Sequence, residues 1–223
     1  MTRQWTPEQK ELIEMTDGSL PVFPRVSVSA DAGSGKTSTL VERIKKYVEA
    51  SPKDKPPRIL CVSFTEKSAA DLESRLAAYS TCEVYTIHGY CARVVQEFGA
   101  RLGLAPIFRV LDAEEEKPLY FECFENVFRR RPVSTETHGP ETYYRLCQSF
   151  KDKGARTGGV PIFDANGESE ELVSFAREVF EEFSTAKRAM KALEYSDLEI
   201  YAAEILKSDE VARTLQKRYQ HVF

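Results

Sequence analysis

The chain has 223 residues, with 31 lysines and arginines against 35 aspartates and glutamates, which gives a formal net charge of −4. With 42% hydrophobic residues it has the composition of a globular protein, long enough for one large domain or for a domain with an insertion. No apolar run reaches the ~18 residues that span a bilayer, and the N-terminus has no apolar signal core, so we expect a cytoplasmic protein without membrane contact. Because nucleic-acid-binding proteins often have a basic excess, any DNA contact has to come from a local patch.

The cysteines are odd in number and widely spaced, at Cys61, Cys82, Cys91, Cys123 and Cys147. No C-x-x-C pair occurs, so the pattern indicates neither a zinc site nor a disulfide framework. We expect reduced thiols, as in a cytoplasm.

The first half of the chain alternates short apolar stretches with helical patterns. Stretches rich in β-branched and apolar residues predict buried strands over 25–30, 59–64 and 84–87. Each is followed by a helical pattern, over 36–50, 68–79 and 88–98, and the proline-rich segment 51–57 forms a surface loop. Repeated strand–helix units imply right-handed crossovers and a parallel sheet, so the predicted fold class is α/β.

The pattern changes near residue 112. From there to about residue 208 it is mostly helical and rich in charge, with one irregular glycine-rich stretch over 154–167. We interpret residues 113–208 as a helical insertion in a sheet domain that comprises residues 1–112 and 209–223. Residues 219–223 have the pattern of the entry into a further strand and stop without a turn, so we expect a truncated chain.

The strongest chemical signal lies between the first predicted strand and the first long helix, at Ala32-Gly33-Ser34-Gly35-Lys36-Thr37. A glycine-rich loop between a strand and a helix is the context that a P-loop requires. The glycines allow tight backbone turns, successive N–H groups form an anion nest, and the positive helix end adds to the attraction. Lys36 supplies a charge for the β- and γ-phosphates, and the Thr37 hydroxyl is placed to ligate Mg²⁺. We predict that residues 32–37, together with Ser38, bind ATP, with Lys36 and Thr37 as the catalytic residues.

The general P-loop pattern has glycine where this chain has Ala30. The loop instead resembles that of UvrD-like superfamily 1 DNA helicases, on Ala30-x-Ala32-Gly33-x-Gly35-Lys36-Thr37. The wider stretch, with Leu40-Val41-Glu42-Arg43-Ile44 after the loop, is most similar to their AddA/RecB branch. The resemblance implies a RecA-like P-loop NTPase sheet with a helical insertion domain, and the activity of an ATP-dependent DNA helicase that uses Mg²⁺.

Upstream of the loop, a segment resembles the Q motif of the same family, on Trp5-Thr6-Pro7-Glu8-Gln9. By that resemblance Gln9 binds the adenine, since a side-chain amide offers a donor and an acceptor together. A helix N-cap at Thr6 with Pro7 at the first helical position explains the same residues equally well.

Two later segments resemble family motifs that lie along single-stranded DNA. Residues 62–72 are similar to motif Ia, T-F-T-N-K-A-A-x-E-M, which implies DNA contacts for Phe64, Thr65 and Lys67. Glu66 stands where asparagine is usual, and a carboxylate is unfavourable beside phosphate. Residues 86–91 are similar to T-x-H-[SG]-F-C, which implies that Thr86, His88 and Tyr90 lie beside the DNA, with tyrosine replacing the common phenylalanine.

The resemblance is clear over residues 1–112, thin over the helical part, and returns at 193–198, which is similar to D-F-x-D-L. In the family, a strand ending in D-E-x-Q-D follows, and residues 218–223 fit the approach to it. Those acidic residues support Mg²⁺ and activate water, and a second RecA-like domain supplies an arginine finger. We expect these parts to be absent here, so that the parent protein is an enzyme and this chain alone is inactive.

Two other functions stay open: a small P-loop phosphotransferase, and a non-catalytic module that only binds nucleotide or DNA. The order of the motifs after the P-loop favours the helicase, with single-stranded and duplex DNA as partners. A nuclease domain or a second subunit is a further partner that the sequence leaves undecided. The run Arg129-Arg130-Arg131 is either a grip on duplex DNA or a solvated helix end.

Overall fold

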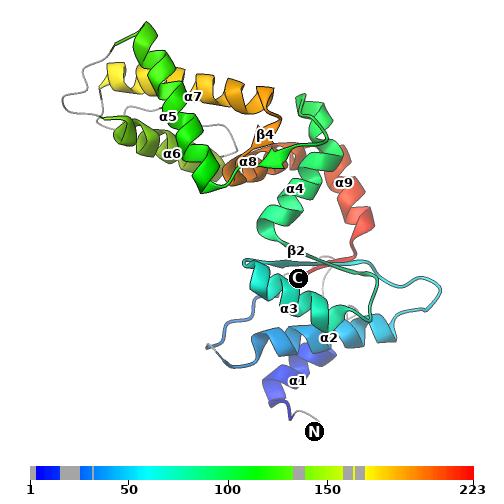
Figure 1. Ribbon diagram of the computed structural model, residues 1–223. Helices are drawn as coiled ribbons and strands as arrows, with labels where there is room; N and C mark the ends of the chain where they lie inside the picture. The colour runs from blue at the N-terminus through cyan, green and yellow to red at the C-terminus, as the bar shows by residue number, and fades with distance from the viewer. Residues whose placement is uncertain (1–3, 16–25, 32, 133–138, 158–162, 164–168) are drawn as a thin grey trace. The chain divides into compact units, whose positions relative to one another are not determined.

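The computed structural model describes residues 4–15, 26–31, 33–132, 139–157, 163 and 169–223. The chain forms two compact units, Met1–Ile87 with Leu215–Phe223, and His88–Thr214 (Figure 1). The chain passes from the first unit to the second within α4 (Ile87–Phe98) and returns within α9 (Asp209–Arg218). Arg25 and Ala32, which belong to the predicted first strand and the predicted loop, lie outside the described residues.

A parallel sheet of three strands forms the centre of the first unit. β1 (Ile59–Ser63) lies between β2 (Cys82–Thr86) and β5 (His221–Val222). Ile59 pairs with Cys82 on one side and with His221 on the other. The first three residues of β1 are all buried, which explains why this strand has a continuous apolar sequence rather than an alternating one. The prediction of a parallel sheet from alternating strands and helices is confirmed.

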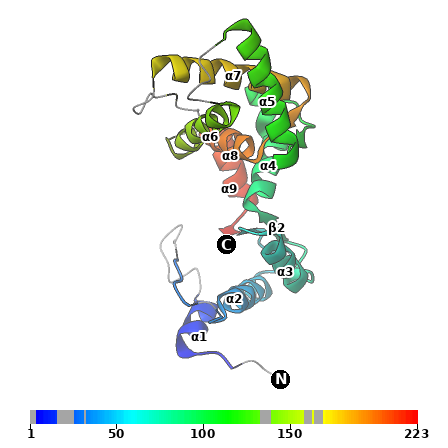
Figure 2. The same cartoon turned by 60° about the vertical axis from the view of Figure 1, so that its left-hand side comes forward.

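Three helices accompany this sheet: α1 (Pro7–Glu14), α2 (Lys36–Ala50) and α3 (Glu66–Leu76). α2 and α3 share one apolar core with β1, made of Val41, Ile44, Ile59, Cys61, Leu72 and Leu76. α1 packs along α2, as both views show (Figure 1 and Figure 2). The phosphate loop therefore opens a helix that is anchored in the core on one face and covered by α1 on another.

The first predicted strand is wrong in the part that the structure describes. Residues 26–30 are extended chain, and no described residue pairs with them in a ladder. Val26 and Val28 are 47% and 48% exposed, although a buried strand was expected. Their side chains line a cavity of about 320 Å³ whose opposite wall includes Val222 and Phe223. β-Branched residues favour a strand only where a neighbouring strand supplies hydrogen bonds and packing, and here the segment stands apart from β5.

The second unit is mainly helical. After α4 come α5 (Ala113–Arg130), α6 (Pro140–Thr157), α7 (Glu170–Ala189) and α8 (Tyr195–Leu206), with a short ladder between β3 (Arg109–Val110) and β4 (Ala192–Leu193). α5, α6 and α7 pack around an aromatic core that contains Tyr120, Phe124, Tyr143, Phe150, Phe175 and Phe183. The many helices match the charge-rich helical pattern expected here. The boundaries predicted at residues 112/113 and 208/209, where the sequence pattern changes, differ from the limits of the two compact units and stay a prediction.

Candidate functional site: a phosphate loop and a sheet edge

The loop before α2 has the backbone that its glycines predict. Gly33 and Gly35 have φ angles of +80° and +89°, in the left-handed region where a residue with a side chain is strained. Gly35 is also the N-cap of α2, and no side chain caps this helix end. The first N–H groups of α2 are therefore not satisfied by a cap of the usual kind, which is the arrangement that binds an anion.

The side chain of Lys36, although exposed, folds back onto the loop. Its Nζ atom donates hydrogen bonds to the carbonyl oxygens of Ala30, at 2.5 Å, and Asp31, at 2.8 Å. Thr37 is exposed beside it. An ammonium, an exposed hydroxyl and an uncapped helix end meet within a few residues, and this donor set fits a magnesium-bound triphosphate.

Gln9 connects α1 to this loop. Thr6 and Gln9 form a reciprocal capping box: the Thr6 hydroxyl accepts from the Gln9 N–H at 3.3 Å, and the Gln9 Oε1 accepts from the Thr6 N–H at 3.0 Å. The other end of the same amide, Nε2, donates to the Ser34 carbonyl at 2.9 Å. The helix-cap interpretation of this segment is confirmed, and the adenine contact of Gln9 stays a prediction.

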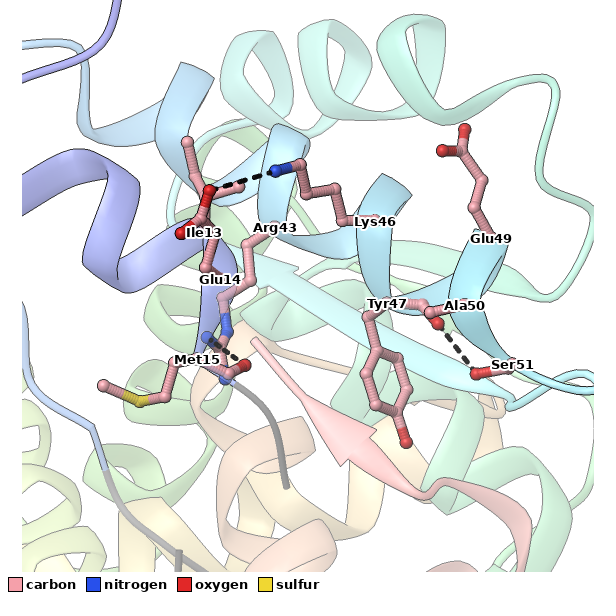
Figure 3. Close-up of a pocket in the computed structure, with 9 residues that line it drawn as sticks. All are labelled: Ile13, Glu14, Met15, Arg43, Lys46, Tyr47, Glu49, Ala50 and Ser51. Carbon is pink, nitrogen blue, oxygen red and sulfur yellow. Dashed lines mark hydrogen bonds and ion pairs between the residues drawn. The ribbon is translucent and has the colours of Figure 1, made fainter. Parts of the chain in front are cut away.

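The packing of α1 on α2 is fixed next to the loop. Arg43 donates from Nη1 to the carbonyl oxygens of Leu12 and Met15, at 2.5 and 3.1 Å, and so satisfies the end of α1. Figure 3 shows Arg43 beside Met15. Lys46 lies 3.7 Å from Glu14 on the same side. Glu14, Met15, Arg43 and Lys46 line a cavity of about 590 Å³ between the C-terminal halves of the two helices. Because α1 is held at this end, Gln9 at its other end is held against the phosphate loop.

Ser38, in the first turn of α2, is held from a neighbouring helix. Arg75 of α3 donates to the Ser38 hydroxyl oxygen at 3.2 Å and pairs with Asp71 at 3.0 Å. Asp71 belongs to the segment that resembles motif Ia. The loop helix and the motif Ia helix are thus joined by side chains as well as by their common core.

The motif Ia residues begin α3 at the carboxyl end of β1. Phe64 is 84% exposed, and Lys67 is exposed one turn along. Thr65 is the N-cap of α3: its hydroxyl oxygen accepts from the Ser68 N–H at 3.2 Å and lies 2.9 Å from the Ser68 hydroxyl. The side chain of Thr65 is therefore committed to the helix, whereas the ring of Phe64 is available to a ligand.

The second predicted DNA segment begins at the same sheet edge. Thr86 ends β2 and pairs in register with Ser63, so the last residues of β1 and β2 emerge together. Thr86 itself is only 7% exposed, while His88 and Tyr90 are half-buried in α4. In the second unit, His88 Nε2 lies 3.1 Å from Glu199, and its ring centroid is 4.9 Å from that of Tyr195. Thus Phe64 and Lys67 are exposed at the sheet edge, His88 is engaged by α8, and Thr86 is covered.

Glu83 of β2 has a shifted acidity. Burial raises its pKa, but hydrogen bonds from Arg58, Tyr219 and Tyr85 outweigh burial and lower the pKa below the ordinary value.

Among the thiols, burial raises the pKa of Cys61 to about 12 and that of Cys91 to about 11, and all five cysteines are free. These buried thiols are protonated near neutral pH and poorly nucleophilic.

Residues 5–223 match the UvrD/REP helicase N-terminal domain family. The chain belongs to this family. It is similar to the probable DNA helicase II homolog of Rickettsia conorii, at 25% identity over 222 residues, which cover 97% of this chain and 32% of that protein. It is also similar to the ATP-dependent DNA helicase PcrA of Leuconostoc citreum, at 25% identity over 231 residues, which cover 100% of this chain and 29% of that protein.

A relative from the helicase/nuclease branch is more similar over a shorter region. An ATP-dependent helicase/nuclease subunit of Thermoanaerobacter sp. (strain X514) is 32% identical over 173 residues, which cover 67% of this chain and 13% of that protein. The predicted membership of the UvrD-like helicases is confirmed. This helicase domain spans about a third of the length of the helicase II relatives and less of the others.

The sequence patterns do not indicate several contacts that the structure shows at the site. Arg75, Tyr195 and Glu199 touch predicted site residues from 37 to 111 positions away in the chain. No local spacing signals such contacts.

None of the described helices is long and apolar enough to cross a membrane.

Proposed function

We propose that this chain is the nucleotide-binding and single-stranded-DNA-binding N-terminal portion of an ATP-dependent DNA helicase motor, with ATP and Mg²⁺ as cofactors. Its sheet unit corresponds to a RecA-like NTPase domain, and the second unit to a helical insertion. The observation that carries the proposal is the phosphate loop: left-handed Gly33 and Gly35, the Lys36 ammonium inside the loop, and an uncapped α2, in a chain that matches a helicase family over residues 5–223.

At the loop, the chain's own groups account for phosphate binding. Lys36, which bonds to the carbonyls of Ala30 and Asp31, would bind the phosphate oxygens of the nucleotide, together with the N–H groups at the start of α2. Thr37 would ligate Mg²⁺ through its hydroxyl, and Gln9 orients the loop from one side. Bound Mg²⁺–ATP supplies the γ-phosphate whose hydrolysis drives the motor.

The residues proposed to contact single-stranded DNA are Phe64 and Lys67 at the sheet edge of the first unit, and His88 in the second unit. An exposed ring stacks on any base without reading sequence, and the lysine contributes phosphate attraction that the chain's net charge of −4 does not provide. Parallel sheets commonly bind ligands at the carboxyl ends of their strands, where β1 and β2 end. Thr65, Thr86 and Tyr90 act in this proposal by shaping the edge.

The parent protein has further domains in this proposal. By similarity to the helicase/nuclease relatives, we propose that the parent protein has either a nuclease activity or a partner subunit. A small-molecule phosphotransferase is disfavoured, because the family match covers the motifs after the P-loop and not only the loop itself.

The test is a titration of a fluorescent ATP analogue with Mg²⁺, with and without an oligothymidine strand. Lys36→Ala should abolish nucleotide binding and leave the fold intact, whereas Lys53→Ala, an exposed lysine of the 51–57 loop, should bind like the wild type. Single-stranded DNA should change the nucleotide affinity, and nucleotide should change the DNA affinity by the same factor. Equal nucleotide binding by Lys36→Ala would refute the loop assignment, and the absence of any DNA effect would favour a nucleotide-only function.

A further inference from the structure

Four charged side chains lie inside the second unit, away from both parts of the site described above. Lys151 of α6 and Glu194, the N-cap of α8, have 2% of their side-chain surface exposed. Lys187 of α7 has 4% and Asp197 of α8 has 10%. Ionised groups are rarely buried to this degree, because removal from water is costly unless each charge is paired.

Each charge of this network is paired. Lys151 Nζ donates to both carboxylate oxygens of Glu194, at 2.5 and 2.7 Å. Lys187 Nζ donates to both Glu194 and Asp197. Burial disfavours the ammonium of Lys187, but the carboxylates of Asp197 and Glu194 outweigh burial and raise its pKa. Two positive and two negative groups therefore form one neutral, buried unit.

Aromatic packing closes the network on its other side. The Nζ atoms of Lys151 and Lys187 lie 5.2 and 4.7 Å from the ring centroid of Phe183. The two lysines can move little without losing a carboxylate or a ring. Replacing a buried ionic network by well-packed apolar residues is often neutral or stabilising, whereas removing only one partner of a pair is strongly destabilising.

The network fixes the start of α8. Glu194 and Asp197 form its capping box, in which Asp197 accepts from the Glu194 N–H at 3.0 Å. The same two carboxylates are clamped by lysines from α6 and α7. The first turn of α8 is therefore attached to two other helices through charge, in addition to the ordinary backbone bonds.

The first two turns of α8 present the two residues that engage His88. Tyr195 lies between the two carboxylates in sequence and is 51% exposed, and its ring is tilted against that of His88 with the centroids 4.9 Å apart. Glu199, one turn further along, lies 3.1 Å from His88 Nε2. The orientation of the imidazole thus depends on where α8 begins.

We propose that Lys151, Lys187, Glu194 and Asp197 are positioning residues: they fix the first turn of α8, which orients His88, and so set the affinity for single-stranded DNA without touching it. The proposal rests on the proposed DNA contact of His88. If the network were purely structural, a network variant and a core variant of equal stability would have the same effect on His88. A positioning network changes His88 only in the network variant.

The experiment uses the whole chain with the double variant Lys187→Met/Asp197→Asn. This change removes one charge of each sign, leaves Lys151 paired with Glu194, and keeps an acceptor in the capping box. Val179→Ala is the control, because Val179 is fully buried in the same helix but belongs to the aromatic core. The complementary variant Lys151→Met/Glu194→Gln tests the other half of the network by the same criteria.

Two readouts are compared at matched thermal stability. The imidazole NMR signals of His88, assigned among the three histidines with a His88→Gln variant, should shift in the double variant and not in Val179→Ala. The affinity for oligothymidine should fall about tenfold in the double variant, with little further loss on adding His88→Ala, because the two changes act through one contact.

Unmoved His88 signals in both double variants would overturn the proposal, as would an equal loss of DNA affinity in Val179→Ala. Additive losses for the network variant and His88→Ala would also contradict it. If the wild-type chain binds no oligothymidine, the proposed DNA contact fails, and the NMR signals alone then decide whether the network positions His88.

Discussion

Gln9 joins α1 to the phosphate loop, because one end of its side-chain amide closes the capping box with Thr6 while the other donates a 2.9 Å hydrogen bond to the carbonyl oxygen of Ser34. By resemblance Gln9 binds the adenine base, but in the structure it links the end of a helix to the phosphate-binding backbone. A substitution can remove one of its two side-chain hydrogen bonds and keep the other.

Gln9→Glu keeps the acceptor for the Thr6 N–H but has no donor for the Ser34 carbonyl. We expect this variant to lower the affinity for Mg²⁺–ATP about 3–10-fold, the effect of one hydrogen bond, while the melting temperature stays close to that of the wild type. Gln9→Ala should lose the same affinity and also destabilise α1. Isothermal titration and thermal melts measure both effects, with exposed Lys10→Ala as the control. A wild-type affinity in Gln9→Glu would show that the link to Ser34 does not order the loop.

Glu83 gives a prediction about pH. Its carboxylate accepts from Arg58 at 2.5 Å, Tyr219 at 2.9 Å and Tyr85 at 3.1 Å, and its pKa is lowered in the folded state. A lowered pKa means that the group stabilises the fold above its unfolded pKa of about 4.3, and that this contribution is lost as the pH falls through the folded value. Acid should therefore weaken the attachment of Tyr219, which lies two residues before β5, to Glu83 of β2.

The measurement is the melting temperature of the wild type and of Glu83→Gln between about pH 6 and pH 3. The wild type should be more stable at pH 6, and the difference should shrink steadily as the pH falls. Glu73→Gln, a change at an exposed carboxylate of α3, should keep a constant difference over this range. A Glu83→Gln difference that also stays constant would mean that the carboxylate is not preferentially ionised in the fold.

The parts of this domain that could be predicted from sequence are those whose cause is local. The phosphate loop requires glycines at left-handed positions next to a lysine, and Gly33, Gly35 and Lys36 satisfy that requirement within four residues. Capping is equally local, and Thr6 with Pro7 marks the start of α1. The apolar periodicity predicts that α3 begins at residue 68, but the helix begins at Glu66, because Thr65 caps it earlier.

What could not be predicted depends on partners that are distant in the sequence. Residues 26–30 have strand composition, but whether they form a strand depends on a neighbour, and they are exposed beside β5 instead of paired with it. The buried network has the same character. Lys151 is 43 positions from Glu194, and a lysine on a charged helix is ordinarily solvated, so only the packing of α6 against α8 shows its role.

The arginine run at the end of α5 is engaged within its own unit. Arg130 pairs with Glu182 at 2.9 Å, and Arg131 pairs with Glu178, both on α7. We expect Arg130→Ala/Arg131→Ala to leave duplex DNA affinity within about twofold of the wild type, and to lower stability by about 1 kcal/mol or less per pair, as is usual for exposed ion pairs. Fluorescence anisotropy with a duplex and chemical unfolding measure the two effects. A large loss of duplex affinity would restore the interpretation of the run as a DNA grip.

The exposed ring of Phe64 gives the sharpest prediction about DNA. A phenylalanine that is 84% exposed at the carboxyl end of β1 contributes little to the core, so its removal should leave the fold unchanged. Stacking of an aromatic ring on a base contributes about 1–3 kcal/mol, so Phe64→Ala should weaken oligothymidine binding roughly 5–150-fold at low salt. Ile107→Ala is the matched control, because that side chain is also apolar and 82% exposed.

Salt separates stacking from charge at the same edge. Removing one lysine–phosphate interaction with single-stranded DNA should reduce the slope of log affinity against log salt by about 0.7. Lys67→Ala should therefore flatten the salt dependence, whereas Phe64→Ala should lower the affinity at every salt concentration and leave the slope unchanged. Anisotropy titrations at several salt concentrations give both numbers for each variant. If Phe64→Ala binds like the wild type while Ile107→Ala does not, the DNA lies on the second unit and the sheet edge is not its track.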